Sequence, residues 1–503
     1  MRPWLCWRDI LAGMSKGQNK PDRAAGWSWF GVISRGPAAA DRFLDEAQTR
    51  TFRILWAFLP EPSIARDLRF QQLLASRFLS DAGQKSLTFG ALIAVARSGG
   101  SALELALVGA AALIPSAVFG LYGGVVADQL PKRVALAGVY VGQAVMCFLV
   151  PPLFGTGLPV VLLLIFVIST LGQVSSPTES SVLPLVASDK QLASAAAMIN
   201  LAAAAGNGVG MALLAPMVVR SSGIEPVFYL AGVLLLLAAS RVFDLPVWKK
   251  PAKAGSAVPR VRVGPAVTWL AQNPAVATII IVAVLAGTVN LVLVTLAPRY
   301  VESVLHADAA DTAYVLAPSA VGVVIALVSA PSIMRIAGER VAALVGLGLG
   351  TAFLFSLGLV GDIASVVDPA NPIRLLSLSG LSLGKELRTA SLLALPLAFG
   401  VSLATTSVQT YINRRVPIRY QGRTFALQSA VRDGAAIAPL LALGAAASRF
   451  GTDRVLLVSP FLLLALGYAL LQLSFRFAER APPSYLEATE SFWEEPEAKQ
   501  EET

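Results

Sequence analysis

The sequence predicts an all-α membrane protein with twelve transmembrane helices, and three observations lead to this fold class. The 503 residues are 55% hydrophobic and only 14% charged, with a mean hydropathy of +0.67, values outside the range of water-soluble globular proteins. Apolar runs of about 20 residues, the length that crosses a bilayer, recur along most of the chain. Short loops rich in proline, glycine or charge separate these runs.

The composition excludes several other classes of protein. The only two cysteines, Cys6 and Cys147, rule out a disulfide-rich secreted scaffold. The single histidine, His306, is too little for a histidine metal site or a Ser/His/Asp hydrolase, so we expect no metal and no catalytic residues. The net charge of +9 fits the cytoplasmic loops of a membrane protein better than nucleic-acid binding.

The first 67 residues are polar and basic and are expected to form a cytoplasmic tail. No signal peptide is visible, because residues 1–14 lack a continuous apolar core before a small-residue cleavage site. Within the tail, residues 39–59 mix apolar and charged positions. This segment is either an amphipathic helix on the membrane surface or a partly disordered stretch with helical tendency.

Twelve apolar runs are the candidate spans. In chain order they cover residues 70–96, 103–125, 134–153, 158–177, 192–219, 226–243, 275–298, 313–333, 341–360, 391–411, 424–447 and 455–475. An even number of spans returns the chain to its starting side. The predicted domains are therefore the tail 1–67, a six-helix bundle at 68–243, a linker at 244–274, a second bundle at 275–475, and an acidic tail at 476–503.

The loop charges predict the orientation. Lysine and arginine gather in alternate loops and in the linker, which places that side and both termini in the cytoplasm. The opposite loops carry acidic residues: Glu104, Glu225, Glu302, Asp308 and Asp311. Division into two groups of six spans also suggests repeated halves, and repeated halves are the usual construction of secondary transporters.

One loop carries a family motif. Residues 124–133 read Gly-Val-Val-Ala-Asp-Gln-Leu-Pro-Lys-Arg, which resembles the signature of the major facilitator superfamily, Gly-x-x-x-Asp-(Arg/Lys)-x-Gly-(Arg/Lys)-(Arg/Lys). Gly124, Asp128, Lys132 and Arg133 match, whereas glutamine and proline replace a basic residue and a glycine. A weaker copy at residues 331–340 follows the eighth span.

Three further stretches resemble one branch of that superfamily, which includes the enterobactin exporter and macrolide efflux proteins. They are residues 181–187 followed by 191–200, then 297–301, and 420–425. The resemblance covers about residues 68–475 and implies the major facilitator fold, with two pseudo-symmetric six-helix bundles. It also implies that spans one, four, seven and ten line a central cavity.

The resemblance implies a cytoplasmic gate at the motif. Asp128 would face the start of span eleven near Gly422 and Arg423 in the outward-facing state, where the positive helix terminus attracts a carboxylate. The alternative is that Asp128 only caps a turn. Lys132 and Arg133 would then only follow the charge bias of cytoplasmic loops.

The first span carries a polar stripe. Arg77, Asp81 and Lys85 are spaced by four, with Gln84 beside them, so they share one helical face. Each charge at the bilayer centre costs roughly 2.5 to 3.5 kcal/mol, which pairing and exposure to a watery cavity reduce. Asp81 is the first candidate for proton coupling. The alternative is an internal salt bridge with Arg77 or Lys85.

Other polar positions are weaker candidates. Arg432 and Asp433 lie midway along span eleven, and neighbours on a helix point about 100° apart, so at least one is expected to need a partner on another helix. Asp433 is a second coupling candidate or a tie between helices. Glu179 near the cytoplasmic end of span four is expected in interfacial water, and the alternative is that it lines the inner vestibule. Asn290 and Gln409 are cavity candidates by resemblance, or bonds between helices.

Glycines in two apolar spans are expected to let neighbouring helices approach closely. Gly206, Gly208 and Gly210 superficially resemble a nucleotide fingerprint, but no strand precedes them. The same interpretation applies to Gly346, Gly348 and Gly350. No Walker-type sequence is present, which argues against direct use of ATP.

The family resemblance implies a secondary transporter at the plasma membrane that exports a small amphiphilic compound by alternating access. We expect no cofactor, a proton gradient as the energy source, and activity as a monomer in the lipid bilayer. Two alternatives stay open: a flippase for lysophospholipids or other lipid-like molecules, and a non-transporting sensor or assembly protein. An intramembrane enzyme has the least support.

Overall fold

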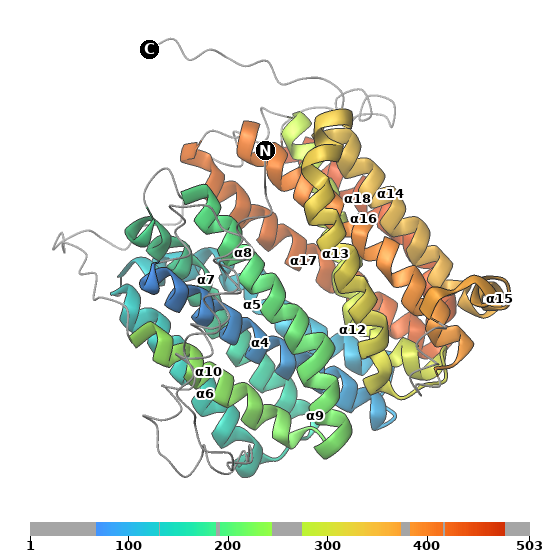
Figure 1. The fold of residues 1–503 in the computed structure, drawn as a ribbon, viewed down its shortest axis with the longest axis horizontal. Coiled ribbons are helices and arrows are strands. Elements are labelled where there is room, and N and C mark those ends of the chain that lie inside the picture. Colours follow the sequence, from blue (N-terminus) through green and yellow to red (C-terminus); the bar gives the residue numbers. More distant parts are fainter. Residues whose placement is uncertain are drawn as a thin grey trace, which may run out of the picture. The chain divides into compact units, whose positions relative to one another are not determined.

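The computed structural model describes residues 67–129, 131–187, 192–243, 274–373, 383–415 and 418–477. Within these ranges all regular secondary structure is helical (Figure 1). The tail segment 39–59, the linker at 244–273 and the acidic tail from residue 478 lie outside the described residues. The same holds for the side chains of residues 121–129 and 418–427, although their backbone is helical.

Each expected span falls on a helix. The N-terminal helices are α4 (Leu68–Arg97), α5 (Ala102–Gln129), α6 (Lys132–Phe154), α7 (Leu158–Val186), α8 (Leu192–Val209), the π-helix η2 (Gly210–Leu214), α9 (Ala215–Ser222) and α10 (Glu225–Phe243). The C-terminal helices are α12 (Pro274–Ser303), η3 (Ala309–Asp311), α13 (Thr312–Ala337), α14 (Glu339–Gly358), α15 (Val360–Val367), η4 (Asp368–Ala370), α16 (Lys385–Arg415), α17 (Ile418–Phe450) and α18 (Thr452–Phe477).

Several helices extend beyond the apolar runs. α7 continues nine residues past the expected end at Pro177, and α12 continues through Pro298. α5 runs to Gln129, four residues past the expected end of the second span, so Asp128 lies on a helix and not in the expected loop. Proline is tolerated inside membrane helices because neighbouring groups satisfy the backbone carbonyl that it frees.

Eleven of the described helices are long and apolar enough to cross a membrane. α4, the expected first span, is not among them, although its 30 residues exceed the length required. The reason is the polar stripe: Arg77, Asp81 and Lys85 interrupt its apolar sequence. α4 is nevertheless packed extensively against α8 and α10.

Glycines bring α8 and η2 against α4. A Cβ at Gly206 would lie 2.5 Å from the carbonyl oxygen of Phe78, and one at Gly210 would lie 2.5 Å from that of Ala82. The packing interpretation is confirmed for these two positions and wrong for Gly208, which has no atom within 4 Å of such a Cβ. In α14, Gly346 and Gly350 contact α16 closely, whereas Gly348 contacts nothing.

The N-terminal and C-terminal helices pack mostly within their own groups, and α5 with α17 makes the largest contact between the groups. Small residues allow this approach: Gly444 of α17 lies against Ala106 and Ala102 of α5. A Cβ at Gly109 of α5 would lie 2.7 Å from Thr295 of α12. These contacts bring α5, α12 and α17 together.

Candidate functional site

The centre of the candidate site is an arginine shared by two carboxylates. Arg77 Nε of α4 lies 2.7 Å from Asp81 Oδ2, and Arg77 Nη1 donates a hydrogen bond to Glu179 Oε2 of α7 at 2.6 Å. The Tyr140 hydroxyl of α6 donates to the other oxygen of Glu179. We call these four residues the Arg77 cluster; it belongs entirely to the N-terminal helices.

The position of Glu179 corrects the sequence interpretation. The residue is only 3% exposed, so its expected location in interfacial water is wrong. The physical reason is the extension of α7 beyond Pro177, which carries Glu179 along the helix to face α4 and α6. Tyr140 was missed altogether, because nothing in its local sequence indicates a buried carboxylate partner.

The two carboxylates of the cluster are held differently. Glu179 receives two directed hydrogen bonds, from Arg77 and from Tyr140. Asp81 has an ion pair with Arg77, but Arg77 Nε and Asp81 Oδ2 lack hydrogen-bond geometry. The salt bridge that we considered as the alternative role of Asp81 is therefore present, and Asp81 is the less firmly held of the two carboxylates.

A second charged group continues the stripe toward α17. Arg432 Nε donates to Asp433 Oδ1 at 2.7 Å, so the expected divergence of these neighbours does not hold for their charged groups. The long arginine side chain reaches back to the adjacent carboxylate. Lys85 of α4 lies within electrostatic range of both Asp81 and Asp433. The structure thus brings the charges of spans one and eleven together.

Two amide positions have exposed side chains. Asn290 of α12 is exposed on a helix whose other central residues are buried or half-buried, and Gln409 of α16 is also exposed. Gln84 does bond between helices, because its Nε2 donates to Gln143 Oε1 of α6 at 3.3 Å. Gln143 in turn donates to the backbone oxygen of Ile168 on α7.

For most residues of the expected cytoplasmic gate, the structure describes the backbone but not the side chain. Gly124 and Asp128 occupy α5, and Gly422 and Arg423 occupy α17, so no contact between these side chains is described. The motif's two basic residues begin α6: Lys132 is buried, and the Arg133 guanidinium lies 5.6 Å from the centre of the Phe243 ring of α10. Arg133 therefore contributes to packing among the N-terminal helices.

Ion pairs also join the two groups of helices at the other end of α4. Arg97 Nη2 lies 3.1 Å from Asp308 Oδ2, and Arg220 Nη1 lies 2.9 Å from Asp311 Oδ1. We call these contacts the loop ion pairs, because both aspartates lie at the α12–α13 connection. In the sequence these two aspartates indicate only the side of the membrane, and no local pattern predicts their partners.

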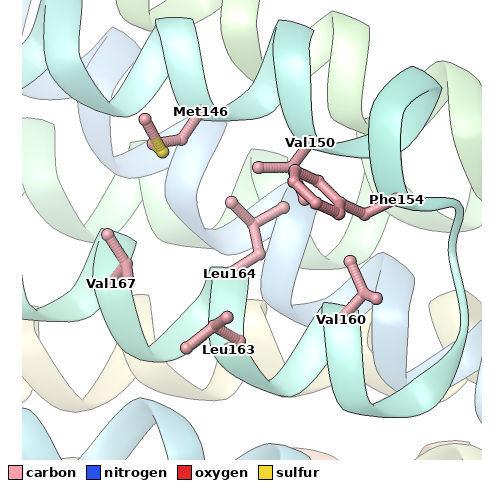
Figure 2. Close-up of a pocket in the computed structure, with 7 residues that line it drawn as sticks. All are labelled: Met146, Val150, Phe154, Val160, Leu163, Leu164 and Val167. Carbon is pink, nitrogen blue, oxygen red and sulfur yellow. The ribbon is translucent and has the colours of Figure 1, made fainter.

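An apolar pocket lies between α6 and α7 (Figure 2). Its lining consists of Met146, Val150, Phe154, Val160, Leu163, Leu164 and Val167. Phe154 and Leu163 are 69% and 65% exposed, which suits contact with lipid tails. Among the described residues, no three His, Cys, Asp or Glu side chains are grouped to hold a metal ion.

The sequence profile of the Major Facilitator Superfamily matches residues 54–439, most of the chain. The chain belongs to this superfamily. No curated protein matches the sequence. The all-α major facilitator fold expected from the motif is confirmed, whereas the branch that contains the enterobactin exporter and macrolide efflux proteins stays a prediction.

Solved structures similar to this superfamily member are transporters. A bacterial homolog of the human lysosomal transporter Spinster, in an inward-facing, unoccupied conformation, has 14% identity and a TM-score of 0.61, over 83% of this chain and 100% of that chain. The nucleoside transporter NupG has 16% identity and a TM-score of 0.59, over 82% and 99%. A D-xylose-proton symporter has 14% identity and a TM-score of 0.58, over 82% and 98%. Identities this low show a shared fold.

Proposed function

We propose that this superfamily member is a proton-coupled secondary transporter that exports a small amphiphilic compound by alternating access. The observation that carries the proposal is the Arg77 cluster, in which one guanidinium serves two buried carboxylates. One carboxylate is enough to pair with Arg77 in a charge network that has only a structural role. A proton carrier requires a carboxylate that can change between its neutral and ionised forms, and the second carboxylate is the candidate. The similarity to a solved proton symporter also favours proton coupling.

Asp81 is the proton carrier in this proposal. Glu179 accepts two directed hydrogen bonds, whereas Asp81 has only an ion pair without that geometry. Lys85 attracts Asp81 from the opposite side to Arg77. Protonation of Asp81 would leave Arg77 paired with Glu179 alone and release Lys85 from Asp81. A substrate that binds to these charged groups and a proton that binds to Asp81 would therefore each change the binding of the other.

The test compares Asp81→Asn with Asp362→Asn, a matched substitution at an exposed carboxylate of α15. Each variant is placed in proteoliposomes with an imposed pH gradient, and uptake of an anionic dye (fluorescein), a cationic dye (ethidium) and a fluorescent lysophospholipid is measured. Asp81→Asn is expected to lose accumulation against a gradient and to keep downhill movement, whereas Asp362→Asn behaves as wild type. Full gradient-driven transport by Asp81→Asn at normal protein levels would reject the proposal and direct attention to Asp433.

The same assay separates the alternatives. Movement of the lysophospholipid without movement of either dye favours the flippase. Binding without movement of any probe favours a sensor. Export of amphiphiles is the first candidate because the apolar spans are rich in alanine, leucine and valine. Within the alternating cycle, the Asp128 gate stays a proposal, based on the motif and on the attraction of a carboxylate to a helix N-terminus.

The proposed location is the plasma membrane, with both termini cytoplasmic and the protein active as a monomer. Single cysteines at Ser256 in the linker and at Gly361 on α15 test the orientation after replacement of Cys6 and Cys147. Gly361 suits this purpose because open space surrounds its Cβ position. A membrane-impermeant thiol reagent is expected to label the two positions from opposite sides. Labelling from the same side would contradict the topology.

A further inference from the structure

Two cations, Lys85 of α4 and Arg432 of α17, are more exposed than the carboxylates beside them. Lys85 is exposed, and the Arg432 side chain is 39% exposed. The neighbouring carboxylates are covered: the side chains of Asp433 and Asp81 are 6% and 12% exposed. A molecule approaching these groups therefore meets the cations before it meets the carboxylates.

Asn290 adds an uncharged hydrogen-bonding group to this surface. The aliphatic part of Arg432 lies directly over Gly287 of α12, where any Cβ would overlap it. Gly287 and Asn290 are three residues apart and thus share one helical face. Because Asn290 is exposed, its amide is available beside Arg432.

Lys85 has no fixed partner in the part of the chain that the structure describes: it is attracted to Asp81 and Asp433 but forms no hydrogen bond or ion pair there. A cation without a close partner inside a membrane protein is costly, and an anion that binds it relieves that cost. Lysine and arginine form strong charge-assisted hydrogen bonds to carboxylate and phosphate, and arginine does so with a planar fork.

We propose that the transported compound carries an anionic head group, a carboxylate or a phosphate, which binds between Lys85 and Arg432 while the Asn290 amide donates a hydrogen bond. This inference rests on the proposed transport function and specifies the charge of the substrate.

The test is an equilibrium binding measurement on the full chain in lipid nanodiscs without a proton gradient. Dodecanoate, dodecyl phosphate and dodecyltrimethylammonium are compared, because they share the same chain length and differ in the head group. The two anions are expected to bind at least about tenfold more tightly than the cation. Lys85→Gln and Arg432→Gln should each lose about tenfold in anion affinity while leaving cation affinity unchanged.

Two further variants serve as controls. Lys85→Arg keeps the charge and should retain anion binding. Lys385→Gln removes an exposed lysine at the start of α16 and should behave as wild type. Equal or tighter binding of dodecyltrimethylammonium by the wild type would overturn the inference, as would wild-type anion affinity in both Lys85→Gln and Arg432→Gln. A glutamine variant that is poorly folded, as judged by its thermal unfolding, is replaced by Arg432→Lys, which should weaken binding of the anions through loss of the planar fork.

The outcome separates this inference from the proposed function. Binding without a gradient depends on the charges of the site and not on coupling. Anion binding with no effect of a pH gradient on wild-type transport would contradict proton coupling alone. Proton-driven transport together with a preference for the cationic probe would contradict the anionic substrate alone.

Discussion

The Arg77 cluster and the loop ion pairs both join arginine to carboxylates, but they differ in how far their side chains are exposed. In the cluster, the side chains of Asp81 and Glu179 are 12% and 4% exposed. In the loop pair of Arg97 and Asp308, the two side chains are 35% and 37% exposed. The cluster lies within the N-terminal helices, whereas the loop pairs join N-terminal helices to the α12–α13 connection.

The difference indicates which contacts can change during a transport cycle. Breaking a buried pair leaves an uncompensated charge and costs about 3–5 kcal/mol, so the Arg77 cluster is expected to persist as the bundles move. Exposed pairs contribute about 0.2–1 kcal/mol, so they can separate and re-form as the bundles move. The loop ion pairs therefore suit contacts that open and close, and the cluster suits a fixed part of the N-terminal helices.

The largest effect is expected from Arg77→Met. Removal of the guanidinium leaves two buried carboxylates without their shared cation and should lower the free energy of unfolding by about 3–5 kcal/mol. Arg97→Met is the matched control, with an expected loss of about 1 kcal/mol or less. Thermal unfolding of the purified proteins measures both. Equal losses would remove the distinction between the two regions.

A smaller effect is expected where α8 contacts the helix that carries the cluster. Gly206→Ala places a methyl group against the Phe78 carbonyl and should cost about 1–3 kcal/mol through displacement of α8 from α4. Gly208→Ala, two residues along the same helix, has open space and should be neutral or slightly stabilising. Unfolding midpoints of the two variants compare the positions directly. A destabilising Gly208→Ala would show that contact with α4 does not decide the effect of a methyl group on this helix.

The smallest effect is expected at the loop ion pairs. A double-mutant cycle with Arg97→Gln and Asp308→Asn should give a coupling energy of about 0.2–1 kcal/mol that decreases as salt rises. The distance distribution between spin labels on α9 and α13 should broaden in each single variant, since the contact joins the two groups of helices. A coupling energy above about 3 kcal/mol would place this pair in the same class as the cluster.

The sequence by itself determined the helices and the stripe. Run length and hydropathy are local properties, so each expected span falls on a helix, and spacing by four placed Arg77, Asp81 and Lys85 on one face of α4. The family motif was also readable directly, because its residues are contiguous. The family and the fold were therefore predictable from the chain alone.

Only the tertiary structure decided which charged residues pair with each other. Glu179 and Arg77 are 102 residues apart, and Arg220 and Asp311 are 91 apart, separations at which no local pattern predicts a pair. The burial of Glu179 depends on α7 continuing past a proline and on the hydroxyl of Tyr140, contributed by another helix. Packing of helices distant in the sequence determines which charges become covered, and that packing separates the firmly held Glu179 from the less firmly held Asp81.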